Sequence, residues 1–102
     1  MKLSLLICSL VNRVDFRNEL LASIDRQKKD GDFEVLMEID RGEESIGHKR
    51  NKLLERSQGD YVAFIDDDDI IAKTYIKKLM GNNGYYHTLL TDLKADVAPY
   101  QG

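Results

Sequence analysis

The sequence predicts an α/β fold in which an open, mainly parallel sheet is flanked by helices. Three short apolar runs, at residues 3–8, 33–39 and 61–65, have the length and composition of buried strands. Between and after them, apolar residues recur at the spacing of an amphipathic helix. Strands that alternate with helices in this way are typical of βαβ units, whose strands pair in parallel. We therefore expect one Rossmann-like domain over residues 1–102.

The three expected strands all lead into polar residues. The run at residues 3–8 is almost continuously apolar, which is typical of a strand covered on both faces, and a polar segment follows from Ser9. The second run, FEVLMEI, is followed by Asp40, and the third, YVAFI, leads directly into Asp66–Asp69. Because ligands of open α/β sheets bind beyond the carboxyl ends of the strands, we expect a functional site at these ends.

Helical spacing of apolar residues predicts three helices. The first is expected from Phe16 with Asp15 as its N-cap, and the second runs from Ser45, a capping residue, to Gly59. The third ends near Gly81 and is indicated by the spacing of Ile71, Tyr75, Ile76 and Leu79.

The last part of the sequence has a weaker pattern. Residues 85–94 are interpreted as a short helix and residues 95–98 as a fragment of a fourth strand. No internal repeat or linker interrupts the chain, so we expect it to form a single unit.

Composition limits the classes of partner. Fifteen Lys and Arg against eighteen Asp and Glu give a formal net charge of −3, which predicts no general affinity for nucleic acid or anionic lipid. The single cysteine, Cys8, lies in an apolar run and is interpreted as a core residue, which favours a reducing, cytoplasmic location. The apolar stretch Leu3–Leu10 is much shorter than the ~20 residues of a membrane span.

The acidic run Asp66–Asp69 is the most informative feature of the sequence. In extended geometry, Asp66 and Asp68 point to one side, while Asp67 and Asp69 point to the other. Two carboxylates on one side, with a substrate phosphate completing the shell, suit a hard cation such as Mg²⁺ or Mn²⁺. The alternative is a solvated acidic loop that caps the following helix.

A basic segment opens the second helix. Residues 48–52 read HKRNK and lie in its first turns, where the macrodipole disfavours cations. Arg50 is four residues from both Ile46 and Leu54, so we expect it on their inward face, opposite an anionic partner such as a diphosphate. An ordinary basic surface with Arg50 at its rim is the alternative. Asp40 is either an acceptor for a base or ribose, or a turn residue.

Several other sites are excluded or disfavoured. The sequence contains neither a dinucleotide-binding glycine pattern nor a phosphate-binding P-loop. His48 and His87 lack metal-ligand spacing to each other or to Cys8, which disfavours a zinc site. A dehalogenase-like phosphatase with Asp66 as nucleophile is disfavoured because two βα units precede the motif. A receiver-like signalling domain lacks its acidic pair after the first strand.

The order of these motifs resembles the N-terminal half of family 2 glycosyltransferases of the GT-A fold. The similarity covers about residues 1–80 and rests on LSLLICSL followed by NR, FEVLMEIDRG, and GHKRNKLLERSQGDYVAFIDDDDI. The segment Gly59–Asp69 is the most specific match, since the family has Gly-Glu-Tyr-Ile-x-Phe-Leu-Asp-x-Asp-Asp there. The chain departs from the family at Leu10, where an aromatic residue is usual, and at Arg41, where a second aspartate is usual.

The resemblance implies a set of site residues. Asp66 and Asp68 correspond to the aspartates of the DxD motif, so Asp68 would coordinate Mn²⁺ or Mg²⁺ and Asp66 would contact the donor ribose or a metal-bound water. Asp40 would contact the base of a nucleotide sugar, most simply a UDP-sugar, and Arg50 would lie along the nucleotide. Ser9 would take the place of the family's first-strand threonine.

The resemblance also implies the function. The family transfers a sugar from a nucleoside diphosphate to an acceptor, and its general base is expected beyond the equivalent of Gly102. We expect a glycosyltransferase, or a truncated form that binds donor and metal with weak or no transfer. The alternative is a non-catalytic nucleotide-binding, metal-binding or assembly module, which could self-associate through an exposed sheet edge.

Overall fold

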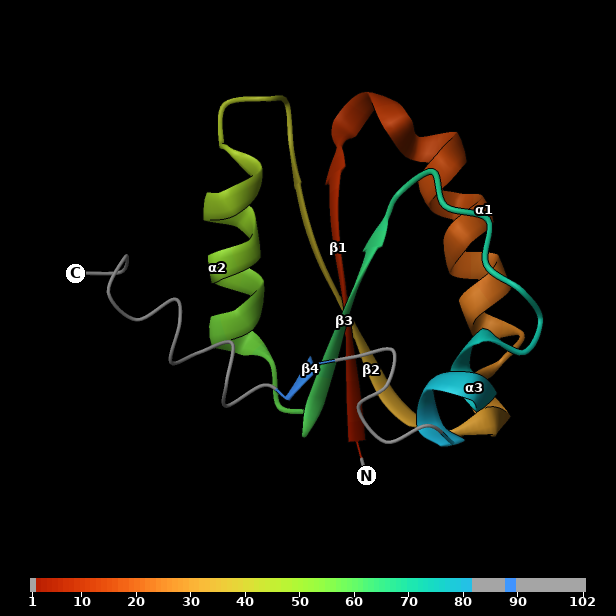
Figure 1. Ribbon diagram of the computed structural model, residues 1–102. Helices are drawn as coiled ribbons and strands as arrows, with labels where there is room; N and C mark the ends of the chain where they lie inside the picture. The colour runs from red at the N-terminus through yellow and green to blue at the C-terminus, as the bar shows by residue number, and fades with distance from the viewer. Residues whose placement is uncertain (1, 82–87, 90–102) are drawn as a thin grey trace.

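The computed structural model describes residues 2–81 and 88–89. Four strands, β1 (Lys2–Leu10), β2 (Asp32–Asp40), β3 (Tyr61–Asp66) and β4 (Thr88–Leu89), form one sheet in the order β2-β1-β3-β4 (Figure 1). β1 pairs in parallel with both β2 and β3, and β4 pairs antiparallel with β3. The predicted open, mainly parallel sheet is confirmed. Association through its edges stays a prediction.

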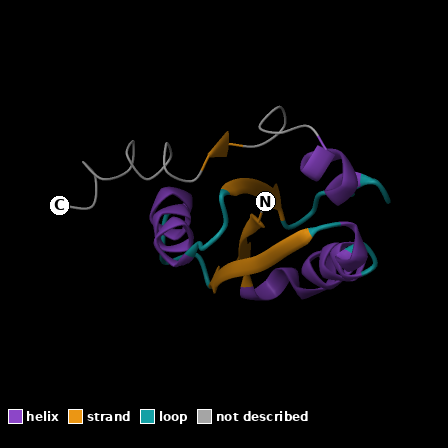
Figure 2. Cartoon of the chain, turned by 90° about the horizontal axis from the view of Figure 1, so that it is seen from below, coloured by secondary structure: helices purple, strands orange, loops and turns teal. Residues whose placement is uncertain are grey.

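Helices cover both faces of this sheet. α2 (Ile46–Arg56) lies on one face, and α1 (Val14–Asp25) and α3 (Tyr75–Gly81) lie on the other (Figures 1 and 2). Two short 3-10 helices, η1 (Val11–Arg13) and η2 (Lys28–Asp30), precede and follow α1. The molecule is therefore a three-layer α/β arrangement, as the alternation of strand and helix patterns predicts.

The apolar strands divide their side chains between two cores. On the face of α1 and α3, the buried residues are Leu3, Leu5, Ile7, Leu20, Ile24, Ala63, Ile65, Ile76 and Leu79. On the face of α2, they are Leu6, Leu53, Leu54 and Val62. Successive residues of a strand point to opposite faces, so a central strand that is covered on both sides must be apolar throughout. This explains the almost continuous apolar run of β1, where the buried Ser4 hydroxyl is paired with Glu34.

The helix boundaries confirm one predicted cap and correct another. Ser45 caps α2, because its hydroxyl accepts a hydrogen bond from the His48 backbone N–H at 3.1 Å. The prediction that Asp15 caps α1 is wrong, since α1 begins at Val14 and its N-cap position is Arg13. Here the chain enters α1 directly from η1, so the start of the helix does not depend on a capping side chain.

The predicted third helix and tail are corrected in part. α3 begins at Tyr75, and Ile71 lies before it. A helix over residues 85–94 is wrong at Thr88–Leu89, which form β4 opposite Tyr61 and Val62. The rest of that helix and the strand fragment at residues 95–98 lie outside the described residues. Within the described part of the chain, none of the helices is both long and apolar enough to cross a membrane.

Candidate functional site

A pocket lies at the edge where the parallel strands end. The strand register places Leu10 opposite Asp40, and Cys8 opposite Asp66, so the polar ends of all three parallel strands meet at one edge. The pocket has a volume of about 360 Å³, which is within the usual range for small-molecule sites. It is lined by β1, η1, α2, β3 and the acidic run, through Leu6, Cys8, Ser9, Leu10, Arg13, Glu44, Ile46, Lys49, Arg50, Phe64, Ile65, Asp66, Asp67 and Asp68.

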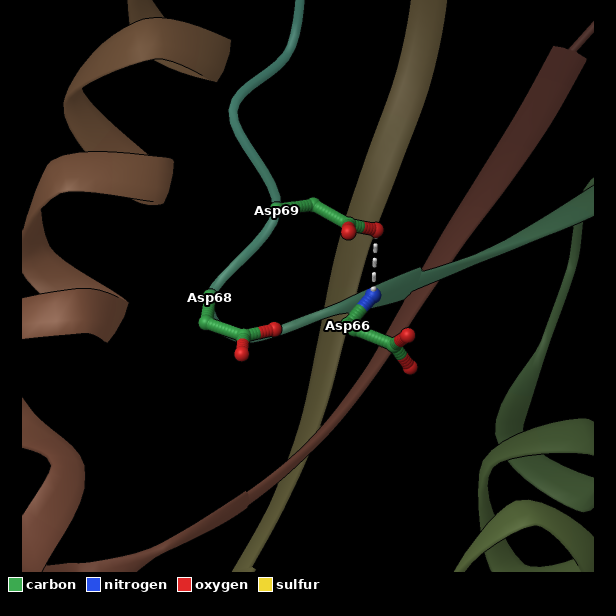
Figure 3. A group of neighbouring side chains, drawn as sticks. All are labelled: Asp66, Asp68 and Asp69. Atoms are coloured by element: carbon green, nitrogen blue, oxygen red, sulfur yellow. Dashed lines mark hydrogen bonds between the residues drawn. The ribbon is translucent and has the colours of Figure 1, made fainter.

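The acidic run folds into a turn, which we call the acidic turn (Asp66–Asp69). The Asp69 backbone N–H donates to the Asp66 carbonyl at 3.0 Å. The Asp66 backbone N–H donates to Asp69 Oδ2, also at 3.0 Å (Figure 3). Asp66, Asp68 and Asp69 are exposed, and each offers one carboxylate oxygen within 4.8 Å of the others. Three oxygen donors therefore gather on one side of the turn.

The turn changes the predicted arrangement of the four carboxylates. Asp66 and Asp68 share a side, as predicted, but the expectation that Asp69 lies opposite them is wrong. Alternation of sides holds only while the chain stays extended. Because β3 ends at Asp66 and the chain turns there, Asp69 comes back beside Asp66 and becomes a third candidate ligand.

Asp67 alone among the four turns inward. It is 7% exposed, and its Oδ2 accepts hydrogen bonds from Ser9 Oγ at 2.7 Å and from Arg13 Nε at 2.7 Å. Burial opposes ionisation of Asp67, but these two hydrogen bonds and the positive charges of Arg13 and Arg17 outweigh burial and lower the pKa of the carboxyl. Asp67 is thus held as a carboxylate inside the site.

The three exposed carboxylates fit a divalent cation. Oxygens bound to one Mg²⁺ lie within about 4.2 Å of one another, and the three oxygens here lie within 4.8 Å of one another. Carboxylate oxygens are the donors that Mg²⁺ and Mn²⁺ prefer. The open side of the turn leaves room for water or phosphate oxygens to complete the shell. Asp66, Asp68 and Asp69 are therefore the residues that would hold such an ion.

Asp40 forms a buried ion pair at the end of β2. Its Oδ1 lies 2.8 Å from Lys49 Nζ, and its Oδ2 accepts from the Glu44 backbone N–H at 2.8 Å. The side chains of Lys49 and Asp40 are only 5% and 10% exposed. The hydrogen bond from Lys49, followed by that from Glu44, lowers the pKa of Asp40. Both oxygens of Asp40 thus have protein partners, and Lys49 is the member of the pair that lines the pocket.

The orientation of α2 differs from the predicted one. Lys49, Leu53 and Leu54 are the buried residues of this helix, whereas Arg50 is exposed and Ile46 is 60% exposed. Arg50 is therefore not buried, because the buried stripe is set by Lys49 and Leu53, four residues apart. Arg50 still lines the pocket, with its guanidinium carbon 4.9 Å from the centre of the Phe64 ring.

The structure gathers most of the predicted site residues and adds others. Ser9, Arg50, Asp66 and Asp68 line the pocket. The residues that sequence reasoning missed are Arg13, Lys49, Phe64, Asp67 and Asp69. Arg13 lies in the polar segment after the first strand, and its position there was the available signal. Cys8, which was interpreted as a core residue, is half-buried: it packs against the core under α2 and also lines the pocket, and burial raises the pKa of its thiol.

Comparisons with known proteins place these features in context. The sequence model of glycosyl transferase family 2 matches residues 17–83. EpsH of Bacillus subtilis (strain 168), a protein assigned by name to the glycosyltransferases, is 35% identical over 57 residues, which cover 56% of this chain and 16% of EpsH.

Two crystal structures of S. aureus TarS share the fold. The structure of TarS 1-349 superimposes with a TM-score of 0.64 and 25% identity, over 79% of this chain and 32% of that chain. A second TarS structure gives a TM-score of 0.62 and 25% identity, over 79% of this chain and 19% of that chain. The chain spans less than a third of the length of these TarS chains and of EpsH.

Proposed function

Because the chain belongs to glycosyl transferase family 2, we propose that its pocket binds a nucleoside-diphosphate sugar, with a UDP-sugar as the first donor to test. The observation that carries the proposal is the group of three carboxylates from Asp66, Asp68 and Asp69, of which Asp66 and Asp68 line a ligand-sized pocket. A divalent cation held there, Mn²⁺ or Mg²⁺, would neutralise charge on the diphosphate.

The cationic side chains of the pocket have distinct parts in this proposal. Lys49 is occupied by Asp40, and its Nζ also donates to the Ser9 carbonyl at 3.4 Å, so it fixes the pocket wall. Arg50 is exposed and its guanidinium is oriented by Phe64, which leaves it able to contact a phosphate. We therefore assign phosphate contact to Arg50.

The remaining residues predicted to contact the nucleotide sugar are Asp66, Ser9 and Asp40. Asp66 is exposed at the end of β3 and would contact the ribose or a water on the ion. The sequence predicted that Ser9 and Asp40 bind the nucleotide sugar, with Asp40 at the base. Because Ser9 Oγ donates to Asp67 and Asp40 is paired with Lys49, we assign both residues an indirect part, in which they hold the pocket wall. The acceptor and the general base are assigned to no residue of this chain.

Calorimetric titration of Mn²⁺ tests the metal site. The double variant Asp66→Asn/Asp68→Asn keeps side-chain size but removes two of the three anionic donors, so Mn²⁺ affinity should fall at least about 10-fold. The matched control is Asp25→Asn/Asp30→Asn, which removes the same charge from exposed positions at the end of α1 and in η2. Equal Mn²⁺ affinity in both double variants would contradict the proposal.

A further inference from the structure

A buried hydrogen-bond network is centred on the one residue of the acidic turn that is not a candidate ligand. Its centre is Asp67, whose Oδ2 accepts from both Ser9 Oγ and Arg13 Nε at 2.7 Å. Ser9 is 3% exposed and Asp67 is 7% exposed, so solvent competes little for these hydrogen bonds. The network therefore connects the acidic turn firmly to β1 and η1.

The other side of the network is anchored to the first helix. Arg17 Nη1 donates to Ser9 Oγ at 3.1 Å and to the Leu10 carbonyl at 2.6 Å. The Arg13 guanidinium carbon lies 4.7 Å from the centre of the Phe16 ring, which restricts the orientation of that guanidinium. The orientation of the Arg13 guanidinium is thus restricted by a contact outside the acidic turn.

Arg13 contacts two successive residues of the turn. While Nε binds Asp67, Nη2 lies 3.4 Å from Asp68 Oδ2. A guanidinium has several N–H groups in a rigid planar fork, so it can fix the relative position of two carboxylates, whereas a lysine ammonium is a single point charge. Asp68 is one of the three candidate ligands, so Arg13 connects a candidate ligand to the buried Asp67.

We propose that Arg13 is a positioning residue for the divalent ion: by contacting Asp67 and Asp68 together, it holds the acidic turn in the conformation that brings the oxygens of Asp66, Asp68 and Asp69 to one side. This inference rests on the proposed function. It also gives Ser9 a part in the site through Asp67, because the Ser9 hydroxyl is the second donor to the same carboxylate oxygen.

Simple electrostatics and positioning predict opposite effects when Arg13 is replaced. Removal of a positive charge next to a cation site should strengthen metal binding by Coulomb attraction alone. Loss of a residue that orients the ligands should weaken it, since such outer partners typically contribute 10–100-fold to metal affinity. The sign of the change in affinity therefore separates the two effects.

The experiment measures Mn²⁺ affinity in Arg13→Gln and Arg13→Lys, with Arg56→Gln as the control. Arg56 is exposed at the C-terminal end of α2, whereas the N-terminal half of that helix lines the pocket. Its guanidinium contacts Glu38 Oε1 at 3.0 Å and the Met37 carbonyl at 3.1 Å. We expect affinity about 10–100-fold weaker in Arg13→Gln and weaker also in Arg13→Lys, which keeps the charge but not the two-point contact. Arg56→Gln should bind Mn²⁺ as the wild type does.

The outcomes distinguish this inference from the proposed function. Wild-type or tighter Mn²⁺ binding in both Arg13 variants, while Asp66→Asn/Asp68→Asn loses binding, would overturn the positioning role and leave the metal site standing. No Mn²⁺ binding by the wild type would overturn both. The thermal unfolding midpoint without metal is the second readout: Arg13→Lys should keep a midpoint close to that of the wild type while its Mn²⁺ affinity falls, and a parallel loss of both would indicate a structural role instead.

Discussion

At the residue scale, the four aspartates after β3 have two different environments. Four adjacent carboxylates repel one another, and a protein relieves that repulsion with solvent, with a bound cation or with its own positive groups. Here Asp67 is paired with Arg13 inside the site, and the other three aspartates are exposed. The repulsion that remains among the three exposed carboxylates is what a divalent ion would relieve.

Gly59 precedes β3 at a point where no side chain fits. A Cβ there would lie 2.6 Å from Ser4 Oγ and 2.8 Å from the Ser4 backbone nitrogen. We expect Gly59→Ala to lower the free energy of unfolding by about 1–3 kcal/mol, because β1 and the loop must move apart. At Gly47, in α2, a Cβ meets nothing within 4 Å, so Gly47→Ala should leave stability unchanged or raise it by up to about 1 kcal/mol. Urea unfolding of both variants is the measurement, and equal losses would contradict the packing argument.

Glu34 on β2 should contribute to stability in a pH-dependent way. It accepts from Ser4 Oγ at 2.6 Å and from the Gln58 backbone N–H at 2.7 Å. Burial opposes its ionisation, but these hydrogen bonds prevail and lower the pKa of Glu34 from its ordinary value of 4.5. Since the folded state binds the proton less readily, the stabilisation is complete above about pH 4.5 and is lost as the pH falls through the lower folded-state pKa.

The corresponding variant is Glu34→Gln, measured by urea unfolding across the acid range. It should be less stable than the wild type at neutral pH, and the difference should shrink steadily below pH 4.5. Glu55→Gln, at an exposed position of α2, is the control and should show a much smaller difference. A constant difference between Glu34→Gln and the wild type at all pH values would mean that the Glu34 carboxylate is not the titrating group.

At the scale of elements, buried polar side chains connect segments that lie far apart in the sequence. Gln27, after α1, is 3% exposed; its Oε1 accepts from the Ile76 backbone N–H at 2.9 Å, and its Nε2 donates to the Ala72 carbonyl at 2.9 Å. These bonds fix the start of α3 and the segment that leaves the acidic turn. The end of α1 is thereby coupled to the position of the site.

Replacement of Gln27 by leucine should loosen that connection. The change keeps the approximate volume but leaves the buried Ile76 backbone N–H unpaired, which costs about 1–3 kcal/mol. The Ala72 carbonyl still accepts from the Tyr75 backbone N–H. We expect a lower free energy of unfolding and faster amide exchange at Ile76. Gln58→Leu, at an exposed position, is the control. Wild-type exchange at Ile76 in Gln27→Leu would show that the side chain does not hold α3.

Some features of the helices and strands could be predicted from the sequence, and others could not. Apolar periodicity was sufficient for the three parallel strands and α2, because their buried faces repeat regularly. Periodicity did not predict which residues of α2 are buried, because Lys49 takes a buried position by pairing with Asp40. It was also insufficient for Asp69, since the turn that brings it to Asp66 depends on hydrogen bonds absent from an extended chain.

At the scale of the whole molecule, the parallel sheet explains why the site exists. Parallel pairing brings the carboxyl ends of β1, β2 and β3 to one edge, and that edge carries Ser9, Asp40 and the acidic turn. The parallel sheet follows from the order of strand and helix patterns, and the superposition on TarS confirms the fold class. Asp67 is buried while its three neighbours are exposed, because it contacts Ser9 and Arg13. These contacts depend on the packing of β1, η1 and β3, and the spacing of residues in the sequence could not predict them.

The central claim is that a divalent ion on the acidic turn brings a nucleoside diphosphate into the pocket. The most direct test is the affinity of the chain for UDP with and without saturating Mn²⁺. Two ligands that share one site stabilise each other's binding by typically 1–3 kcal/mol, so UDP should bind about 5–150-fold more tightly when Mn²⁺ is present. In Asp66→Asn/Asp68→Asn this difference should disappear. If wild-type UDP affinity is the same with and without Mn²⁺, the acidic turn does not join metal to nucleotide and the claim is wrong.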